Sequence, residues 1–520
     1  MFVWKNINDK SNSINSISRR KLQQTNFDDE IENYVYEKHN EENIPIICQV
    51  KEVLYEHDPL LNLTSSSEFH CIENITDDIY VLEKLPQRFL KRYQSILRLG
   101  NTWIQLERHQ MNISMAKISM SSRTEIRILN LISSLRLALP FTFNPNRGIG
   151  TKKILIVKVS SIDSKSTISE HDMSDAVFGT YGDKRNLKSQ YDACSYGQLD
   201  MVPANGFKIE NGVLNLHLMV PARLTPAPYL QYIAMATARM KAGPFRPRFD
   251  HVMLCLPPDA LGTWVAYAYI NSFLSVYKDK WCTYISSQMH EVGHNLGLDH
   301  AGIPDNEYGD TTGMMGFSYE IKNWPRKCFN AEKSWNLGWY KDRHRTIDAR
   351  TLTTWGGRFI GIPSYNDTNV RENEDFISIV KIRTYRFFHS RDVYIMFNEK
   401  KTMNFDTSRF PNSVTIVRGK AGGKSSSIAG LRKGEKQPIE QKGPFKNIIV
   451  EVCSLTRGNK YTGEPMNAFV SIYKDDGINE SLCNPTEEND LNEALGIITI
   501  PPENDDDDLL IGDNLSFDLI

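Results

Sequence analysis

Several features that mark common protein classes are absent from this chain of 520 residues. No apolar run approaches the roughly 18 residues that a membrane-spanning helix needs, so the sequence predicts no transmembrane segment. No repeat of fixed period occurs, which argues against solenoids and propellers. No two cysteines form a CxxC pair, which argues against a cysteine zinc knuckle or a thioredoxin-like site. With 61 basic and 63 acidic residues the net charge is only -2, so composition predicts no nucleic-acid partner.

Both ends of the chain have the composition of disordered segments. Residues 1–25 are rich in Asn and Ser and contain no continuous apolar core of the kind that a secretory signal has. The stretch 484–520 holds eleven acidic residues and no Lys or Arg. A charge run of this kind is usually a solvated tail. We therefore expect disorder over 1–25 and 485–520.

Between these ends the residue pattern changes twice. Residues 26–147 mix a strand-like run, Ile44–Tyr55, with a more helical stretch, Leu85–Leu99, and a linker follows at Pro140–Gly150. Residues 148–344 alternate apolar strands with helices, as in an α/β or α+β layer. The strands are expected at Ile154–Val159, Val213–Val220 and His251–Leu256, and the helices at Asn186–Ala193 and Tyr229–Lys241.

Residues 345–484 contain short β-rich runs separated by turn residues, which favours a β-sandwich-like domain. Within it, the stretch Arg418–Lys446 has eight basic and two acidic residues among many glycines. Two interpretations stay open for this stretch. A long mobile surface loop is favoured over a site for a polyanion.

One stretch, His290–His300, fits the pattern HExxHxxGxxH at every fixed position. At the composition of this chain, chance gives the pattern roughly 4 times in 100,000 such sequences. On a helix, residues four apart lie on one face, so His290 and His294 can present nitrogens to one ion. Gly297 allows the chain to leave the helix in a left-handed conformation, and His300 then approaches from another direction.

Three imidazoles leave one position of a tetrahedral zinc site open for water. Glu291 follows the first histidine and is rotated by about 100° on the helix, so it can reach such a water without binding the metal. The pattern therefore predicts a Zn²⁺ site formed by His290, His294 and His300, with Glu291 as general base. The other nine histidines show no paired spacing and receive no role.

Further stretches match a known family. They are NLKSQYDACSYGQLDMVPA from Asn186, FDHVMLCLPP from Phe249, TWVAYAYIN from Thr263, YGDTTGMMG from Tyr308 and CFNAEKSWNLGWY from Cys328. With the zinc motif, they make the chain resemble the gametolysin family of metzincin metallopeptidases, the algal cell-wall lysins and their relatives. The resemblance covers residues 152–340. Ala301 stands where adamalysins usually have Asp after the third histidine, which favours gametolysins.

The resemblance implies an α+β metzincin catalytic domain over 148–344, with a twisted mixed sheet and an active-site helix. A small mixed, prodomain-like domain (26–147) would precede it, and the β-sandwich-like domain (345–484) would follow. By position, the resemblance also implies zinc ligation by His290, His294 and His300, acid/base work by Glu291, and a methionine turn at Met315. Metzincins bind substrate along an edge strand, and Thr263–Tyr277 is the expected strand here. Two interpretations are open for Tyr319: it stabilises an oxyanion, or it is an ordinary tyrosine in the wall of the site, which is favoured.

These features predict a monomeric zinc-dependent endopeptidase that cleaves extracellular-matrix or cell-wall glycoproteins. Secretion is expected from the resemblance, although no signal peptide follows Met1. The alternative is an inert metzincin-fold protein whose β-rich C-terminal domain binds cell-wall glycans or glycoproteins. A prodomain thiolate from Cys48 or Cys71 could block the metal, but a disulfide between them is favoured. A bridge between Cys282 and Cys328 is plausible, although eight cysteines allow 105 pairings.

Overall fold

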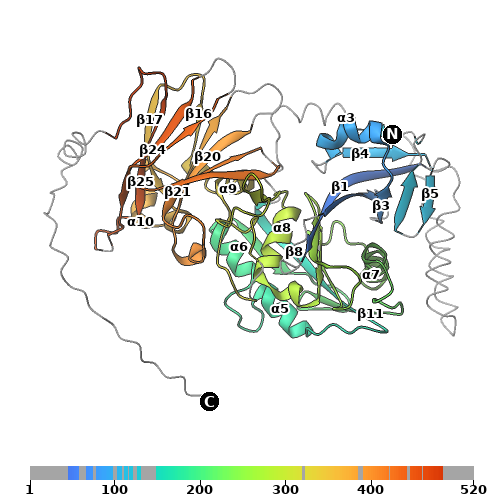
Figure 1. The fold of residues 1–520 in the computed structure, drawn as a ribbon. Helices are drawn as coiled ribbons and strands as arrows, with labels where there is room; N and C mark the ends of the chain where they lie inside the picture. Colours follow the sequence, from blue (N-terminus) through green and yellow to red (C-terminus); the bar gives the residue numbers. More distant parts are fainter. Residues whose placement is uncertain are drawn as a thin grey trace, which may run out of the picture.

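The computed structural model shows a mixed α+β protein that is rich in β-sheet (Figure 1). The tails 1–25 and 485–520, Tyr319 and all but the last residues of the linker Pro140–Gly150 lie outside the described residues. Among the described helices, none is long and apolar enough to cross a membrane. The described residues are 45–57, 66–73, 78–97, 102–107, 111–114, 116–120, 124, 126–129, 148–318, 322–384, 391–420, 422–441, 446–459 and 461–483.

The N-terminal part is a small sheet built around one long strand, β1 (Ile46–His57). This strand pairs with β2 and β4 within the N-terminal part and with β13 of the following part. The strand predicted at Ile44–Tyr55 and the helix predicted at Leu85–Leu99 are thus confirmed within a few residues. The remaining elements are β2 (Ser66–Glu73), β3 (Ile79–Glu83), α3 (Gln87–Leu97), β4 (Thr102–Leu106), β5 (Met111–Ser114), β6 (Lys117–Met120) and β7 (Ile126–Ile128).

The central part continues the same sheet, in the order β10-β11-β8-β12-β14-β13-β1. Strands β11, β8, β12 and β14 run parallel, whereas β13 and β1 run antiparallel to their neighbours. The strands are β8 (Gly150–Ser161), β9 (Leu199–Pro203), β10 (Ile209–Glu210), β11 (Val213–Leu218), β12 (His251–Leu256), β13 (Trp264–Tyr269) and β14 (Leu274–Lys278). The helices are α5 (Glu170–Phe178), α6 (Leu187–Ser195), α7 (Ala227–Ala242), α8 (Ile285–Asn295) and α9 (Ala331–Leu337).

The alternation of side chains along β8 explains why both faces of the sheet are covered. Ile154 and Ile156 belong to a core with α6 and α8, whereas Leu155 and Val157 belong to a second core with α7. A strand that is buried on both faces must be apolar at successive positions. The sequence run ILIVKV satisfies this condition, and the strands and helices expected in this part are confirmed.

The prediction of a single strand over Thr263–Tyr277 is wrong in one respect, because two antiparallel strands occupy this stretch. Asn271 has a φ of 52° and lies between β13 and β14. A short polar side chain tolerates the left-handed conformation that such a tight turn requires. As a result, β14 lies inside the sheet, and β13 alone faces β1.

The C-terminal part consists of two sheets that share one core. The first has the order β15-β22-β21-β20-β19-β16 and the second β18-β17-β25-β24-β23. In the first sheet the strands are β15 (Ala301–Gly302), β16 (His344–Asp348), β19 (Ile379–Arg383), β20 (Asp392–Asn398), β21 (Ser413–Gly419) and β22 (Ser425–Leu431). In the second they are β17 (Thr354–Ile360), β18 (Phe376–Ile377), β23 (Lys436–Ile439), β24 (Ile448–Thr456) and β25 (Asn467–Lys474).

The long loop favoured over Arg418–Lys446 is wrong for a large part of that stretch. Strands β22 and β23 occupy it, and β22 pairs antiparallel with β21. The small residues of β22 conceal its strand character from a prediction based on β-branched and aromatic residues. The domain boundaries at 147 and 344 stay predictions.

Four disulfides stabilise these parts, and the described residues include no free cysteine. The predicted bridge Cys48–Cys71 is confirmed and joins β1 to β2. The plausible bridge Cys282–Cys328 is wrong, because Cys282 pairs with Cys255 at the end of β12, and Cys328 pairs with Cys194 of α6. The fourth bridge is Cys453–Cys483.

Helix α9 carries a buried ion pair where it contacts the C-terminal sheets. The Lys333 ammonium lies 2.8 Å from the Glu332 carboxylate, and both side chains are almost completely buried. Lys333 also donates to the carbonyl of Gly423, at 2.7 Å, between β21 and β22. Burial raises the pKa of Glu332, although the charge of Lys333 opposes that shift.

We expect Lys333→Met to destabilise the protein by about 3–5 kcal/mol, because the substitution leaves a buried carboxylate without its charge partner. Urea unfolding followed by tryptophan fluorescence measures the loss. The double variant Glu332→Leu/Lys333→Met serves as the control, since it removes both charges and should recover most of the stability. Equal stability of Lys333→Met and the wild type would contradict this role.

Candidate metal centre

Helix α8 carries His290, Glu291 and His294, and all of its side chains are buried. Its C-terminal end is held by the turn between β13 and β14. The Asn271 amide donates to the His294 carbonyl at 2.9 Å, and the side-chain amide of Asn295 donates to carbonyls on both strands. The first bond reaches a carbonyl group at the end of the helix, and the other two attach the helix end to both strands.

After the helix, the chain turns back as the motif predicts. Gly297 has a φ of 94°, in the left-handed region, and the Leu298 amide donates to the Gly293 carbonyl at 3.0 Å. The returning segment is then fixed on both sides of His300. The Ala301 amide donates to the Met315 carbonyl at 2.8 Å, and the Ser425 amide of β22 donates to the His300 carbonyl at 3.0 Å.

The three imidazoles of the motif converge. Their ring centroids lie 4.7 Å (His290 and His294), 5.4 Å (His290 and His300) and 4.9 Å (His294 and His300) apart. The Nδ1 atom of His290 lies 2.8 Å from the Met314 carbonyl oxygen, and that of His294 lies 2.8 Å from the Leu298 carbonyl oxygen. A carbonyl oxygen can only accept, so Nδ1 donates in both rings and Nε2 is left to bind an ion.

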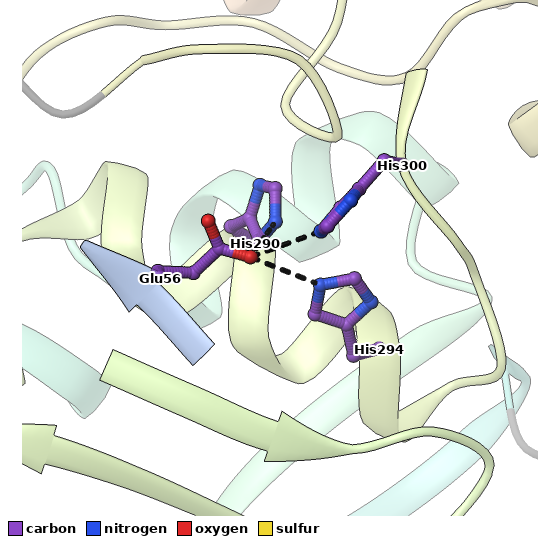
Figure 2. A group of neighbouring side chains, drawn as sticks. All are labelled: Glu56, His290, His294 and His300. Atoms are coloured by element: carbon purple, nitrogen blue, oxygen red, sulfur yellow. Dashed lines mark hydrogen bonds and ion pairs between the residues drawn. The ribbon is translucent and has the colours of Figure 1, made fainter. Parts of the chain in front are cut away.

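A fourth group, which the sequence did not reveal, lies among these rings. Glu56 of β1 directs its carboxylate to the imidazoles, as Figure 2 shows. One oxygen, Oε1, lies 2.9 Å from Nε2 of His300, 3.6 Å from Nε2 of His290 and 3.9 Å from Nε2 of His294. One ligand atom from each of the four residues lies within 4.8 Å of the other three.

The donor set fits zinc. Ligands bound about 2.0–2.1 Å from a tetrahedral zinc ion lie about 3.3–3.4 Å from one another, which is close to the three oxygen–nitrogen distances around Oε1. Imidazole nitrogen and carboxylate oxygen are both ordinary zinc ligands. Among the described residues, Nε2 of His294 is buried without a hydrogen-bond partner. A buried polar atom of this kind is costly unless an ion or a water binds it.

The charges around the three imidazoles favour a positive charge in the space between them. Burial lowers the pKa of His294 to about 4, so this ring is neutral, as a metal ligand must be. Burial acts in the same direction on His300, but the carboxylates of Glu56 and Glu307 outweigh it and raise the pKa to about 9. Burial alone would raise the pKa of Glu56, yet the charge of His300 and the proximity of all three rings hold it well below its usual value.

Glu291 differs from Glu56 in its surroundings. Within the described part of the chain, both of its carboxylate oxygens are buried and have no hydrogen-bond partner. Burial, with a smaller contribution from the charge of Glu56, raises the pKa of Glu291 well above its usual value. A buried carboxyl with a raised pKa beside a metal-binding cluster has the properties of a proton-transfer group.

Met315 lies beneath the helix. A Cβ atom added at Gly293 would lie 2.6 Å from Sδ of Met315, so the methionine occupies the space that the glycine leaves. Met314 contributes its carbonyl oxygen to His290, and both methionine side chains are fully buried. The two adjacent methionines thus have different contacts.

Three residues near the rings were not found from the sequence. Glu56 is 234 positions before His290, and no spacing rule connects the two. Glu307 places a carboxylate oxygen 3.5 Å from Nδ1 of His300 and also forms an ion pair with Lys424. The ring centroid of Tyr308 lies 4.3 Å from that of His300. Glu307 and Tyr308 lie shortly after the third histidine in the sequence, but their residue types do not distinguish them from ordinary loop residues.

Comparisons with known proteins agree on one family. The family model described as gametolysin peptidase M11 matches residues 151–416, just over half of the chain. The chain is also similar to an autolysin from Chlamydomonas reinhardtii, at 33% identity over 93 residues. That match covers 16% of this chain and only 14% of the autolysin.

Among solved structures, wild-type OgpA from Akkermansia muciniphila is similar at 13% sequence identity and a TM-score of 0.25. The match covers 62% of this chain and 95% of OgpA. A TM-score this low carries no argument about fold or function.

We expect Gly293→Ala to destabilise the protein by about 1–3 kcal/mol, because the new methyl group must displace a fully buried sulfur. Intrinsic helix propensity alone would favour alanine by about 1 kcal/mol, so the two effects predict opposite signs. Urea unfolding of Gly293→Ala, Met315→Ala and the double variant measures the coupling between the two sites. A more stable Gly293→Ala protein would refute the contact.

Proposed function

The chain belongs to the gametolysin peptidase M11 family, a family of metallopeptidases, and we propose from this premise that it is a zinc-dependent endopeptidase. The observation that carries the proposal is the convergence of three buried imidazoles on one point, with a buried carboxyl next to the first in the sequence. We propose His290, His294 and His300 as the zinc ligands. Glu291 is the proposed general base, and Met315 the methionine of the turn beneath the site.

In this proposal, bound zinc acts as a Lewis acid on the peptide carbonyl and on water. Glu291 accepts a proton from the attacking water and later returns it to the nitrogen of the leaving amine. The raised pKa of Glu291 makes its carboxylate a stronger base toward that proton. Carbonyl groups of Met314 and Leu298 hold two of the rings in the tautomer that binds metal.

The substrate in this proposal is an extended polypeptide that adds to the edge of β13. Pairing with a sheet edge supplies main-chain hydrogen bonds, whatever the side chains. The central fold is then of the metzincin type, with α8 as the active-site helix beneath this strand. Extracellular-matrix or cell-wall glycoproteins remain the proposed substrates, and the C-terminal sheets remain a candidate glycan-binding region. Four disulfides suit a secreted protein.

Replacing the general base separates catalysis from metal binding. We expect Glu291→Ala and Glu291→Gln to retain one zinc per chain while peptide cleavage falls by about 100- to 10,000-fold. Zinc content is measured by atomic emission and cleavage by a quenched-fluorescence peptide. Because β1 covers the rings, each protein is assayed intact and after cleavage at a protease site inserted within residues 130–147. Undiminished cleavage by either variant would eliminate Glu291 from the mechanism.

Removing the metal discriminates this proposal from the alternative of an inert glycan-binding protein. We expect 1,10-phenanthroline to abolish casein or gelatin cleavage and added zinc to restore it, because the imidazoles alone provide no Lewis acid. If the protein cut in the segment 130–147 degraded neither substrate, with or without zinc, the binding alternative would be preferred. Cleavage that resists the chelator would point to another class of peptidase.

A further inference from the structure

Strand β1 lies along the edge that the proposed substrate would use. Without β1, the sheet of the central part ends at β13. An edge strand presents unpaired amide and carbonyl groups to any extended chain. Residues 53–57 of β1 take up this edge, with Val53 opposite Tyr269, Tyr55 opposite Tyr267 and His57 opposite Trp264. Strand β1 thus takes the place that any strand added to β13 would take.

The register of this pairing places Glu56 at the rings. The pairing is antiparallel and shifts by one residue between Glu56 and His57, so that Glu56 lies opposite Ala266 and His57 opposite Trp264. Such bulges redirect side chains, and they are frequent beside active sites. The shift occurs at the one residue of β1 whose carboxylate contacts all three imidazoles.

The two faces of β1 have different contacts. Successive side chains of a strand point to opposite faces, so Leu54 shares a face with Glu56, whereas Tyr55 points to the other. Leu54 is buried on the face that carries Glu56. The ring of Tyr55 lies 4.6 Å from that of Tyr267, within the core formed with α7. Both faces of the strand are therefore engaged with the central part.

Buried polar contacts hold the N-terminal part in this position. The fully buried Lys51 ammonium donates to the Asn271 carbonyl at 2.7 Å, in the turn that also caps α8. His70 of β2 bonds the Tyr269 hydroxyl at 2.9 Å. Asp78 forms an ion pair with Arg239 of α7. A buried charge that loses its partner is costly. Separating the N-terminal part from the central part would therefore cost free energy at each of these contacts.

We infer that β1 is an internal inhibitor: it occupies the substrate's place on β13, and Glu56 supplies the fourth ligand to the metal. This inference rests on the proposed function. The intact chain is then a latent form of the enzyme. Glu56 brings a side-chain carboxylate, and not a peptide bond, to the three rings, so the segment blocks the site without presenting a scissile bond there.

The alternative of a cysteine thiolate as the blocking ligand does not hold. Cys48 and Cys71 are joined in a disulfide, so neither offers a thiolate. The same bridge joins β1 to β2 at the far end of β1 from Glu56. The disulfide therefore contributes to holding the inhibitory strand, and the carboxylate is the group that reaches the rings.

The test uses the full chain with Co²⁺ in place of zinc, because cobalt absorbs visible light in a manner that reports its ligands. Acetohydroxamate, a small ligand for an open metal position, is titrated into four proteins: wild type, Glu56→Gln, Glu56→Ala and Glu83→Gln. Glu56→Gln preserves the shape of the side chain, and Glu56→Ala opens space. Glu83→Gln is the matched control, since it removes a carboxylate that pairs with Lys117 within the N-terminal part.

We expect acetohydroxamate to bind both Glu56 variants at least about 10-fold more tightly than wild type, because apparent affinity falls with the fraction of sites that are open. Glu83→Gln should behave as wild type. Equal affinity in wild type and both Glu56 variants would overturn the inference. A wild-type chain that binds neither cobalt nor zinc stoichiometrically would instead refute the proposed function, so the two failures are distinguishable.

Discussion

The arrangement on which the rest depends is the convergence of three imidazole nitrogens from two differently directed segments. A helix can bring two histidines to one face, but the third must come from a chain that reverses direction. Gly297 provides the reversal, and hydrogen bonds from Ala301 to Met315 and from Ser425 to His300 fix the returning segment. Backbone contacts with the segments around Met315 and Ser425 thus maintain the position of the third ring.

These contacts explain why the C-terminal sheets matter to the site. Strand β15 directly follows His300 and pairs with β22, so the chain that carries the third histidine forms an edge of the C-terminal sheet. The buried pair of Glu332 and Lys333 connects the same two regions from α9. The gametolysin family model also extends to residue 416, into β21. The segment that carries His300 and the first C-terminal sheet are therefore in direct contact.

The sequence predicts the convergence of the three histidines well because the signal for it is local. The spacing of His290, Glu291 and His294 is set by helix geometry, and Gly297 marks the turn without any knowledge of the fold. The strands of the central part can also be predicted from short stretches of sequence, since burial on both faces requires continuous apolar runs such as Ile154–Val159. The sequence fails where pairing is remote. The disulfide partners of Cys282 and Cys328, and the small-residue strand β22, depend on contacts that no short window contains.

Glu56 is the clearest case of a remote contact. Its sequence neighbourhood, VLYEH, has the pattern of an ordinary strand, and its role appears only when β1 is placed on β13. The three rings that the local motif brings together and the distant strand β1 meet at one carboxylate oxygen of Glu56. X-ray absorption on the zinc-loaded chain tests the central claim most directly. The account predicts one zinc per chain bound only by nitrogen and oxygen at about 2.0–2.2 Å. A sulfur ligand, or no stoichiometric zinc, would contradict it.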